Sequence, residues 1–314
     1  MVLNTPPPVH NQLEFFVEQA SKTPRIRTAV IHPVDQNSLL GAVEAARYNI
    51  IEPILIGPTA KIHAAADAAQ IDISGFEIIN TAHSHESAEV AVELARLCKV
   101  DILMKGGIST DEMLSAILHK TKGVRTERRL SHMFMLDVPN YHKPLMITDA
   151  AINIVPDLSA KRDIVQNAIY FAHAIGIAQP KVAILAAVEK VKPSMMSTID
   201  AAALCKMADR GQIVGGILDG PLAFDNAISL EAARDKQINS PVSGDADILL
   251  APDLEAANMI AKQLIYLADA KSAGIVLGAR VPIVLTSRSE KTLGRLASCA
   301  LAALQVVHNP KKGL

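Results

Sequence analysis

Residues 28–58 read TAVIHPVDQNSLLGAVEAARYNIIEPILIGP and contain the pattern that decides the fold class. The short β-branched run 28–31 predicts a buried strand, and the Ala-rich amphipathic stretch 38–48 predicts a helix after it. A second apolar run, 54–56, predicts the next strand and is stopped by Gly57-Pro58. Continuous apolar strands that alternate with helices are typical of a mostly parallel sheet covered on both faces. The sequence therefore predicts an α/β fold.

The same scheme recurs along most of the chain. Further apolar runs that predict strands lie at 102–104, 182–186, 213–218, 248–251 and 274–277. His132–Leu136 and Leu145–Thr148 are also strand-like, but no helical stretch separates them, so they predict a hairpin-like passage. The 314-residue chain exceeds the usual size of one domain, which favours two α/β lobes over one large domain. The last predicted helix, 293–307, is apolar enough to pack back onto the first lobe.

Composition excludes several classes of function. Thirty-one basic residues nearly balance 32 acidic ones, whereas proteins that bind nucleic acids or membrane surfaces need a large basic excess. Cys98, Cys205 and Cys299 are scattered and suit a reducing compartment better than a disulfide framework. The N-terminus lacks a secretory signal, and no apolar run is as long as a membrane span. We therefore expect a cytoplasmic protein that binds neither nucleic acid nor membrane.

The segment Thr286-Ser287-Arg288 gives the strongest local indication of chemistry. It follows the apolar run 282–285, so a strand would deliver Ser287 and Arg288 to its carboxyl end, where open α/β sheets bind ligands. The start of the following helix suits an anion, and the arginine fork matches phosphate oxygens. Alternatively, Ser287 or Thr292 only caps the helix and Arg288 is solvated. Spacing alone leaves both interpretations open.

A second strand, small-residue turn and helix start occur at Met104–Thr110. Lys105 ends the strand, Gly106 allows close backbone approach, and Ser109 or Thr110 can cap a helix or contact an anion. The order of residues is not that of a Walker A loop, and a plain capped turn fits as well. A third segment, Lys122–Arg129, holds four cations in eight residues. It suits a polyanionic ligand or, more often, a solvated linker.

Several common catalytic signatures are missing from the sequence. There is no Gly-x-Ser-x-Gly elbow, no cysteine beside a histidine in a recognisable motif, and no GxGxxG fingerprint. His83 and His85 lack the helical partner pattern of a metal site, so no metal is expected. These absences argue against an enzyme with a covalent nucleophile and against a Rossmann dehydrogenase.

Several of the segments above, together with further ones along the chain, occur in the order that is typical of one protein family. The matching segments are Met104-Lys105-Gly106 with Ser109-Thr110, Gly123–Thr126 with Arg129–His132, Thr148–Asp157, Leu218–Asp225, Pro252–Asn258 with Lys262, and Pro282–Arg288. From about Ala29 to its C-terminus the chain thereby resembles the phosphate acetyltransferase/phosphate butyryltransferase family. It looks most like the phosphate acyltransferase portion of bifunctional enoyl-CoA hydratase/phosphate acetyltransferase proteins.

The resemblance implies both an architecture and a reaction. The implied fold has two three-layer αβα lobes with mostly parallel sheets, similar to isocitrate and isopropylmalate dehydrogenases. We expect residues 1–140 with 287–314 in one lobe and 141–286 in the other, with the active site in the cleft between them. The implied reaction transfers a short acyl group, acetyl or butyryl, between CoA and phosphate by direct transfer in a ternary complex. The substrates would be coenzyme A or acyl-CoA and phosphate, with no covalently bound cofactor, and the enzyme a homodimer or larger homo-oligomer.

The resemblance also implies roles for individual residues. Arg288 would hold the phosphate oxygens, and Ser287 would donate a hydrogen bond to the developing oxyanion. Ser109, Thr110 and Arg125 match positions that line the phosphate pocket, with Arg125 also near CoA. Further CoA contacts are expected from Lys105, Gly106, Arg129 and Asn258.

Two departures from the family pattern bear on these roles. Many relatives carry an arginine where this chain has Ser115. Acetyl-type relatives place an aspartate, the proposed base for the CoA thiol, about a turn beyond the arginine, where this chain has Leu293 and Gly294. Glu290 is the nearby carboxylate and is our candidate for the base.

Two other functions on the same fold compete with an active transferase. A decarboxylating NAD-dependent dehydrogenase should show magnesium-binding aspartates and an arginine-rich substrate helix, and that combination is not found in the sequence. A non-catalytic acyl-CoA-sensing domain is disfavoured because Ser109, Arg125, Ser287 and Arg288 are retained, whereas Ser115 leaves it open. The sequence therefore favours the active enzyme.

Overall fold

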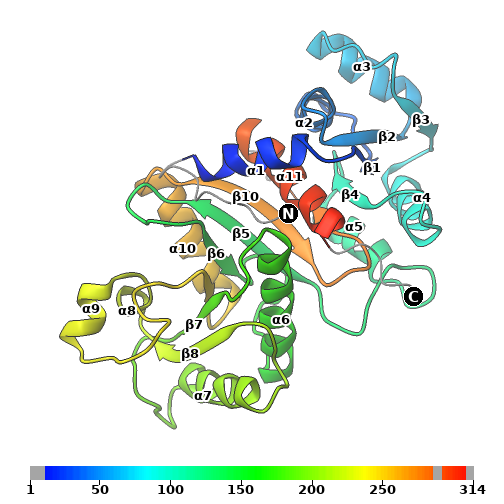
Figure 1. The fold of residues 1–314 in the computed structure, drawn as a ribbon. Helices are drawn as coiled ribbons and strands as arrows, with labels where there is room; N and C mark the ends of the chain where they lie inside the picture. The colour runs from blue at the N-terminus through cyan, green and yellow to red at the C-terminus, as the bar shows by residue number, and fades with distance from the viewer. Residues whose placement is uncertain (1–10, 286–291, 309–314) are drawn as a thin grey trace. The chain divides into compact units, whose positions relative to one another are not determined.

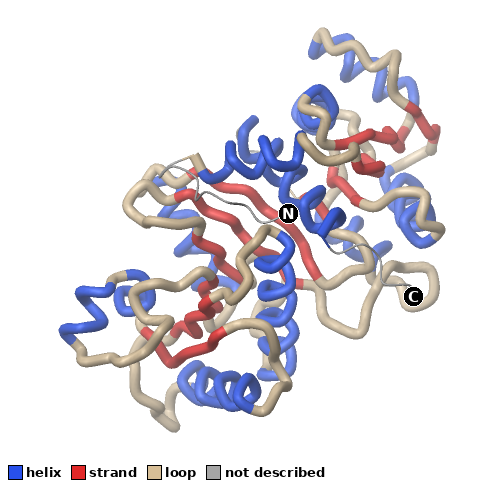
Figure 2. Tube along the Cα trace, in the orientation of Figure 1, coloured by secondary structure: helices blue, strands red, loops and turns tan. Residues whose placement is uncertain are grey.

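The computed structural model describes residues 11–285 and 292–308 (Figure 1). They form two compact units. The first unit contains Leu13–Arg128 and the described chain from Ala273 onward. The second unit contains Arg129–Ser272 together with the first two described residues, 11 and 12. Helices and strands alternate along most of both units, as the sequence predicts (Figure 2).

The first unit is a mostly parallel sheet flanked by helices. Its strands follow the order β3-β2-β1-β4-β11-β10, and all neighbouring pairs are parallel except β10 with β11. The strands are β1 (Ile26–Ile31), β2 (Ile51–Gly57), β3 (Glu77–Asn80), β4 (Ile102–Lys105), β10 (Lys271–Leu277) and β11 (Ile283–Val284). The helices are α1 (Gln12–Ser21), α2 (Gln36–Arg47), α3 (Thr59–Ala69), α4 (Ser84–Arg96), α5 (Thr110–Ile117) and α11 (Thr292–His308).

Local signals in the sequence place the first strand–helix pair. Ala29, Val30 and Ile31 are fully buried, which fits a strand covered on both faces. Asp35 ends the break after β1 and caps α2, because its carboxylate accepts a hydrogen bond from the backbone N–H of Ser38 at 3.0 Å. Burial of apolar residues thus determines where the strand lies, and the Asp35 cap determines where α2 begins.

The second unit repeats the parallel scheme with one antiparallel hairpin. Its strands follow the order β5-β6-β9-β7-β8; β5 pairs with β6 antiparallel, whereas β6 with β9, β9 with β7 and β7 with β8 are parallel. The strands are β5 (Ser131–Asp137), β6 (Leu145–Thr148), β7 (Lys181–Leu185), β8 (Ile217–Leu222) and β9 (Ile248–Leu250). The helices are α6 (Leu158–Ala174), α7 (Met196–Asp209), α8 (Phe224–Ile228), α9 (Leu230–Asp235) and α10 (Leu254–Leu267). All four residues of β6 are buried, and α6 and α10 both contact β5 and β6.

The structure confirms the predicted α/β class and adjusts some boundaries. The predicted hairpin from His132 to Thr148 is present as β5 and β6. The predicted strand 213–218 is shifted, since β8 begins at Ile217; Gly215 just before it has a φ of +87°, which an extended strand does not tolerate. The predicted division at 140/141 lies in the connection between β5 and β6, whereas the compact units divide at 128/129 and 272/273. Pairing of β5 with β6 keeps the whole hairpin in the second unit.

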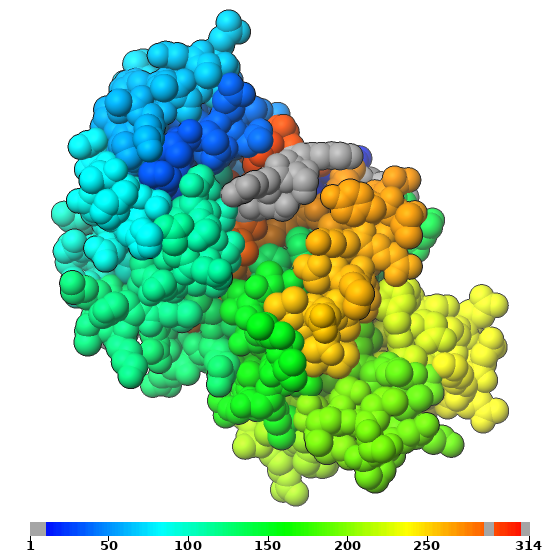
Figure 3. All heavy atoms as spheres, turned by 180° about the vertical axis from the view of Figure 1, so that it is seen from behind, coloured from blue at the N-terminus to red at the C-terminus, as the bar shows by residue number. Residues whose placement is uncertain are grey.

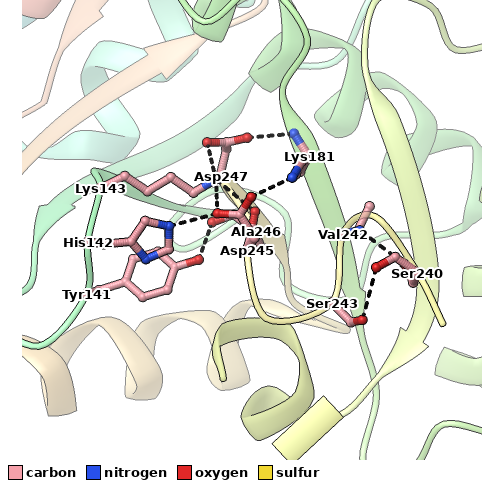
Figure 4. Close-up of polar contacts among 10 residues, drawn as sticks. All are labelled: Tyr141, His142, Lys143, Lys181, Ser240, Val242, Ser243, Asp245, Ala246 and Asp247. Carbon is pink, nitrogen blue, oxygen red and sulfur yellow. Dashed lines mark hydrogen bonds and ion pairs between the residues drawn. The ribbon is translucent and has the colours of Figure 1, made fainter. Parts of the chain in front are cut away.

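A charged cluster fastens the β5–β6 connection to the start of β9 (Figure 4). The Lys143 ammonium contacts the carboxylates of Asp245 at 2.8 Å and Asp247 at 2.9 Å, and Lys181 also pairs with Asp245. Burial alone would raise the pKa of Asp245, but hydrogen bonds from Lys143, Lys181 and His142 outweigh it and lower that pKa. The Tyr141 hydroxyl donates to the carbonyl of Ala246 at 2.7 Å, and burial raises the pKa of this phenol.

The position of this cluster indicates a structural role. Lys143 precedes β6, Lys181 begins β7 and Asp247 precedes β9, and these three strands are parallel. The cluster therefore lies at the amino edge of the sheet. Ligands bind to open α/β sheets at the opposite, carboxyl edge. We assign the cluster to holding the three strand starts together.

Candidate active site

The carboxyl edge of the first unit is built by a tight turn after β4. The backbone N–H of Gly106 donates to the carbonyl of Ile31 at 2.9 Å, and that of Gly107 donates to the carbonyl of His32 at 2.8 Å. A Cβ on Gly106 would lie 2.3 Å from the Ile31 carbonyl oxygen. The end of β4 is thus seated directly on the end of β1, and only glycine permits this approach.

The turn leads into α5 through a capping box. The Ser109 hydroxyl oxygen accepts from the backbone N–H of Glu112 at 3.1 Å, and the Glu112 carboxylate accepts from the N–H of Ser109 at 3.2 Å. Hydrogen bonds from Ser84 and then Ser109 lower the pKa of Glu112. The cap interpretation of Ser109 is therefore correct, and its side chain also hydrogen-bonds to the Glu112 carboxylate. Thr110 stands at the first helical position beside it.

Lys105 supplies a cation at the same edge. It ends β4 and its side chain is partly buried; its ammonium lies 3.4 Å from the carbonyl oxygen of Gly106. The three predicted ligand residues Lys105, Gly106 and Ser109 thus belong to one continuous turn. The structure brings them together at the carboxyl end of β4, where a ligand of a parallel sheet would bind.

Arg125 lies on a separate segment of the first unit that is held against the end of β10. The backbone N–H of Arg280 donates to the carbonyl of Val124 at 2.9 Å, and the Thr126 hydroxyl donates to the carbonyl of Gly278 at 2.6 Å. Arg125 itself forms a β-bridge with Ala279, and its side chain is exposed. Its backbone is fixed while its guanidinium remains open to solvent, which suits a group that meets an anionic substrate.

The strand that precedes the predicted catalytic residues runs beside β4. In β11, Ile283 aligns with Leu103 and Val284 with Met104, in parallel. The carboxyl ends of β11 and β4 therefore meet at one edge of the sheet. Ser287, Arg288 and Glu290 lie outside the described residues. The described chain resumes at Thr292, where α11 begins.

The remaining two candidates, Arg129 and Asn258, belong to the second unit. The Arg129 side chain is exposed, and its backbone N–H and carbonyl bind Asp163 at 3.1 Å and Asn167 at 2.9 Å. The Asn258 amide on α10 donates to the carbonyl of Ala150 at 3.1 Å. Asn258 thus supports the loop after β6. Its use toward CoA stays a prediction.

Sequence reasoning did not single out His32, which directly follows β1 at the same edge as Gly106. Its backbone is left-handed, with a φ of 56°, and its Nδ1 lies 3.2 Å from the Ser87 hydroxyl. Burial, followed by repulsion from Lys61, lowers the pKa of His32. The sequence signal that could have identified His32 was its position directly after the apolar run 28–31, because the residue that follows a parallel strand lies at the carboxyl edge of the sheet, where ligands bind.

The sequence analysis also gave no role to Asp149, which organises the loop after β6. Its carboxylate accepts hydrogen bonds from the backbone N–H groups of His132, Ala151, Ile152 and Asn153, at 3.0–3.2 Å. Beside it, the His132 side chain is fully enclosed, and its Nδ1 has no hydrogen-bond partner among the described residues. Burial outweighs the attraction of Asp149 and lowers the pKa of His132 to about 4.

This histidine makes stability depend on pH. In the unfolded chain His132 binds a proton near its ordinary pKa of about 6.5, but in the folded chain only near 4, so stability is complete above 6.5 and falls as pH drops toward 4. The loss should be about 3 kcal/mol over that range. In His132→Phe this part should vanish, and denaturant unfolding at pH 7.0 and 4.5 measures it. If the free energy of unfolding changed equally with pH in the wild type and in His132→Phe, the role assigned to His132 would be wrong. The stability that Asp245 contributes is lost only below about pH 4, so it does not affect this comparison.

The histidines near the N-terminus of α4 make local contacts. His83 caps α4 by accepting from the backbone N–H of Glu86 at 3.2 Å, and His85 lies 3.1 Å from the Glu112 carboxylate. Within residues 11–285 and 292–308, no group of three or more His, Cys, Asp or Glu side chains is placed to hold a metal ion. In the same ranges no helix is long and apolar enough to cross a membrane.

Fold and edge geometry together define the class: an α/β protein whose candidate ligand turn lies at the carboxyl ends of parallel strands. Residues 84–303 match the family described as phosphate acetyl/butaryl transferase. The chain is 57% identical over 288 residues to the phosphate acetyltransferase of Rickettsia typhi, covering 91% of this chain and 82% of that one. It is 40% identical over 294 residues to the phosphate butyryltransferase of Clostridium beijerinckii, covering 94% and 97%.

A solved structure agrees with these matches. The branched-chain phosphotransacylase from Enterococcus faecalis V583 superposes with a TM-score of 0.79 at 29% identity, covering 90% of this chain and 99% of that one. The chain therefore belongs to the phosphate acetyl/butyryl transferase family. The resemblance inferred from the ordered motifs is confirmed.

Proposed function

We propose that this chain transfers a short acyl group between CoA and inorganic phosphate, and that acetyl is its best substrate. The observation that carries the proposal is the shared edge of β4 and β11, because it gathers Lys105, Gly106 and Ser109 beside the strand that leads to Ser287 and Arg288. Membership of the family supports the reaction. The choice of acetyl rests on the 57% identity to a phosphate acetyltransferase against 40% to a phosphate butyryltransferase.

The proposed reaction is a direct transfer in a ternary complex. A phosphate oxygen attacks the thioester carbonyl carbon and forms the new C–O bond, and the C–S bond breaks as the tetrahedral intermediate collapses and the carbonyl re-forms. The CoA sulfur leaves with the electron pair and takes a proton. No group of the enzyme becomes acylated, which fits the absence of a nucleophile motif in the sequence.

Each candidate side chain has a part in this scheme. Arg288 holds the phosphate oxygens through its planar fork, and Ser287 donates to the carbonyl oxygen as negative charge develops there. Ser109, Thr110 and Arg125 complete the phosphate site, and Glu290 exchanges the proton with the CoA thiol. Lys105, Gly106, Arg125, Arg129 and Asn258 contact CoA. We place the site between the two lobes and the enzyme in the cytoplasm, as a homodimer or larger homo-oligomer.

Release of CoA thiol tests this function. Purified protein is mixed with acetyl-, propionyl- or butyryl-CoA, with and without phosphate or arsenate, and free thiol is followed over time. We expect release that depends on phosphate or arsenate and is fastest with acetyl-CoA. No phosphate-dependent release with any of the three would contradict the proposal. Binding of acyl-CoA without release would favour the sensing domain instead.

A further inference from the structure

His32 lies at the carboxyl edge where the candidate ligand turn is built, and no step of the proposed reaction uses it. Its carbonyl accepts the backbone N–H of Gly107 at 2.8 Å, which joins it to the turn. The Glu112 carboxylate, which accepts from the N–H of Ser109 in the same turn, is near enough to act on the pKa of His32. The His32 side chain is 8% exposed. Helix α4 contacts β1 and β2, α3 contacts β2, and both helices form the light blue to cyan surface in Figure 3.

A chain of buried hydroxyl groups fixes the tautomer of His32. The Ser87 hydroxyl on α4 donates to the carbonyl of His83 at 2.9 Å, and a carbonyl oxygen can only accept. The Ser87 oxygen must therefore accept in its two other contacts, from the Thr81 hydroxyl at 2.7 Å and from Nδ1 of His32 at 3.2 Å. Nδ1 accordingly carries the hydrogen. In the neutral imidazole, the available lone pair is then on Nε2.

Nε2 is the polar atom of this ring that the fold leaves available to a ligand. Within residues 11–285 and 292–308 it forms no hydrogen bond. Protonation of Nε2 leaves the bond from Nδ1 to Ser87 intact, so the ring can take up and release a proton without disturbing the hydroxyl chain. The backbone φ of 56° is strained for a residue other than glycine, and such strain is concentrated at functional sites.

We propose that Nε2 of His32 accepts the proton of the attacking phosphate. The inference rests on the proposed function and adds a second proton-transfer residue to it. As the protonated phosphate oxygen forms the C–O bond, its O–H bond breaks; the proton passes to Nε2, and the bonding electron pair stays on the oxygen. The sulfur leaves with the electron pair of the C–S bond and takes its proton from Glu290. Solvent then removes the proton from His32 and returns one to Glu290, so both groups end as they began.

The surroundings of His32 suit a proton acceptor that is neutral before the reaction. Burial is the largest effect and, with Lys61 on α3, lowers the pKa of His32 below its ordinary 6.5. Glu112 on α5 and Asp35 before α2 oppose this shift, and His83 before α4 adds to it. The imidazole is therefore neutral and able to accept a proton at pH 7.

Two substitutions separate the roles of the ring nitrogens. His32→Asn keeps a polar atom near the position of Nδ1 and tolerates the left-handed backbone, but it removes Nε2. His32→Gln places an amide near the position of Nε2, and this amide cannot take up a proton. Both should lower kcat for phosphate-dependent thiol release about 100-fold. His85→Asn is the matched control, because His85 lies 3.1 Å from the Glu112 carboxylate but is exposed, and it should keep wild-type activity.

The pH dependence of kcat/KM for phosphate gives a readout that a structural role would not change. A base must be unprotonated, so the wild-type value should fall as the pH drops through the pKa of His32, below 6.5. This acid limb should be missing in His32→Asn; phosphate titrates equally in both assays and cancels in their ratio. Added imidazole should restore part of the rate to His32→Gly, since glycine suits the φ of 56°, but none to His32→Asn.

Nitrogen-15 NMR of histidine-labelled protein tests the tautomer independently of activity. The His32 signals, assigned by their loss in His32→Asn, should show hydrogen on Nδ1 and none on Nε2 at neutral pH, and added phosphate should shift Nε2. Denaturant unfolding confirms that each variant is folded. Hydrogen on Nε2, an unchanged acid limb, or more than about a tenth of wild-type kcat in His32→Asn would overturn the proposal but leave the proposed function intact. A wild type without phosphate-dependent thiol release would overturn both.

Discussion

Replacing Arg288 by glutamine is expected to lower kcat/KM for phosphate about 1,000-fold, the upper end of what one transition-state donor contributes. The amide keeps much of the length of the side chain but removes both the charge and the fork that grips two phosphate oxygens. Arg288→Lys keeps the charge and loses the fork, so it should recover only part of the activity. Initial rates of thiol release at varied phosphate measure both variants.

A matched arginine shows whether the loss is specific. Arg210 follows α7 in the second unit and is exposed, so Arg210→Gln should keep wild-type activity. Unfolding by denaturant should give similar stability for Arg288→Gln and Arg210→Gln. If Arg288→Gln retained more than about a tenth of wild-type kcat/KM, the assigned role of Arg288 would be wrong.

Gly106→Ala is expected to damage both the fold of the β4–α5 turn and catalysis. The added Cβ would lie 2.3 Å from the Ile31 carbonyl oxygen and 2.9 Å from the carbonyl group of His32. These are backbone atoms of β1 and cannot rotate away, so the turn must shift. We expect a loss of about 2 kcal/mol or more in stability and, because a displacement near 1 Å misplaces the site, about 100-fold in kcat/KM.

Two other glycines provide graded controls for this change. At Gly107 an added Cβ would lie 2.9 Å from the Asp35 carboxylate, a side chain, and 3.1 Å from the nearest backbone atom, the His32 carbonyl oxygen, so Gly107→Ala should be milder than Gly106→Ala. At Gly75 nothing lies within 4 Å, so Gly75→Ala should be neutral or slightly stabilising. Denaturant unfolding and thiol release on all three variants check the series. Equal behaviour of Gly106→Ala and Gly75→Ala would contradict the close approach of the turn to β1.

Local pattern in the sequence was enough for much of the fold. The runs 28–31, 54–56 and 102–104 form β1, β2 and β4 because residues buried on both faces must be apolar throughout. The missing helix between His132 and Thr148 was a sufficient sign of the hairpin. The antiparallel pairing of β10 with β11 was not predicted, since an apolar run carries no direction. Only the short connection 278–282 hints at it.

The candidate site could be proposed from the sequence where its residues are neighbours in the chain, but not where they meet through contacts between distant residues. Lys105, Gly106 and Ser109 lie on one strand–turn–helix segment, so their order alone indicates a ligand turn. Asp149 reaches His132 across the hairpin, and Ala246 meets Tyr141 across 105 residues. Such pairs follow from tertiary packing and have no sequence period. The exposure of Met259, Tyr266 and Leu267 on α10 was likewise not predictable, because an apolar residue in a helix has the same sequence pattern whether it faces the core or the solvent.

Product analysis tests the central claim most directly. The protein is incubated with acetyl-CoA and labelled inorganic phosphate, and both free CoA and labelled acetyl phosphate are quantified at early times. Direct transfer predicts one acetyl phosphate for each CoA released, with initial-rate lines that intersect when both substrates are varied. CoA released without acetyl phosphate, or no CoA released at all, would contradict the assignment of this chain as a phosphate acyltransferase.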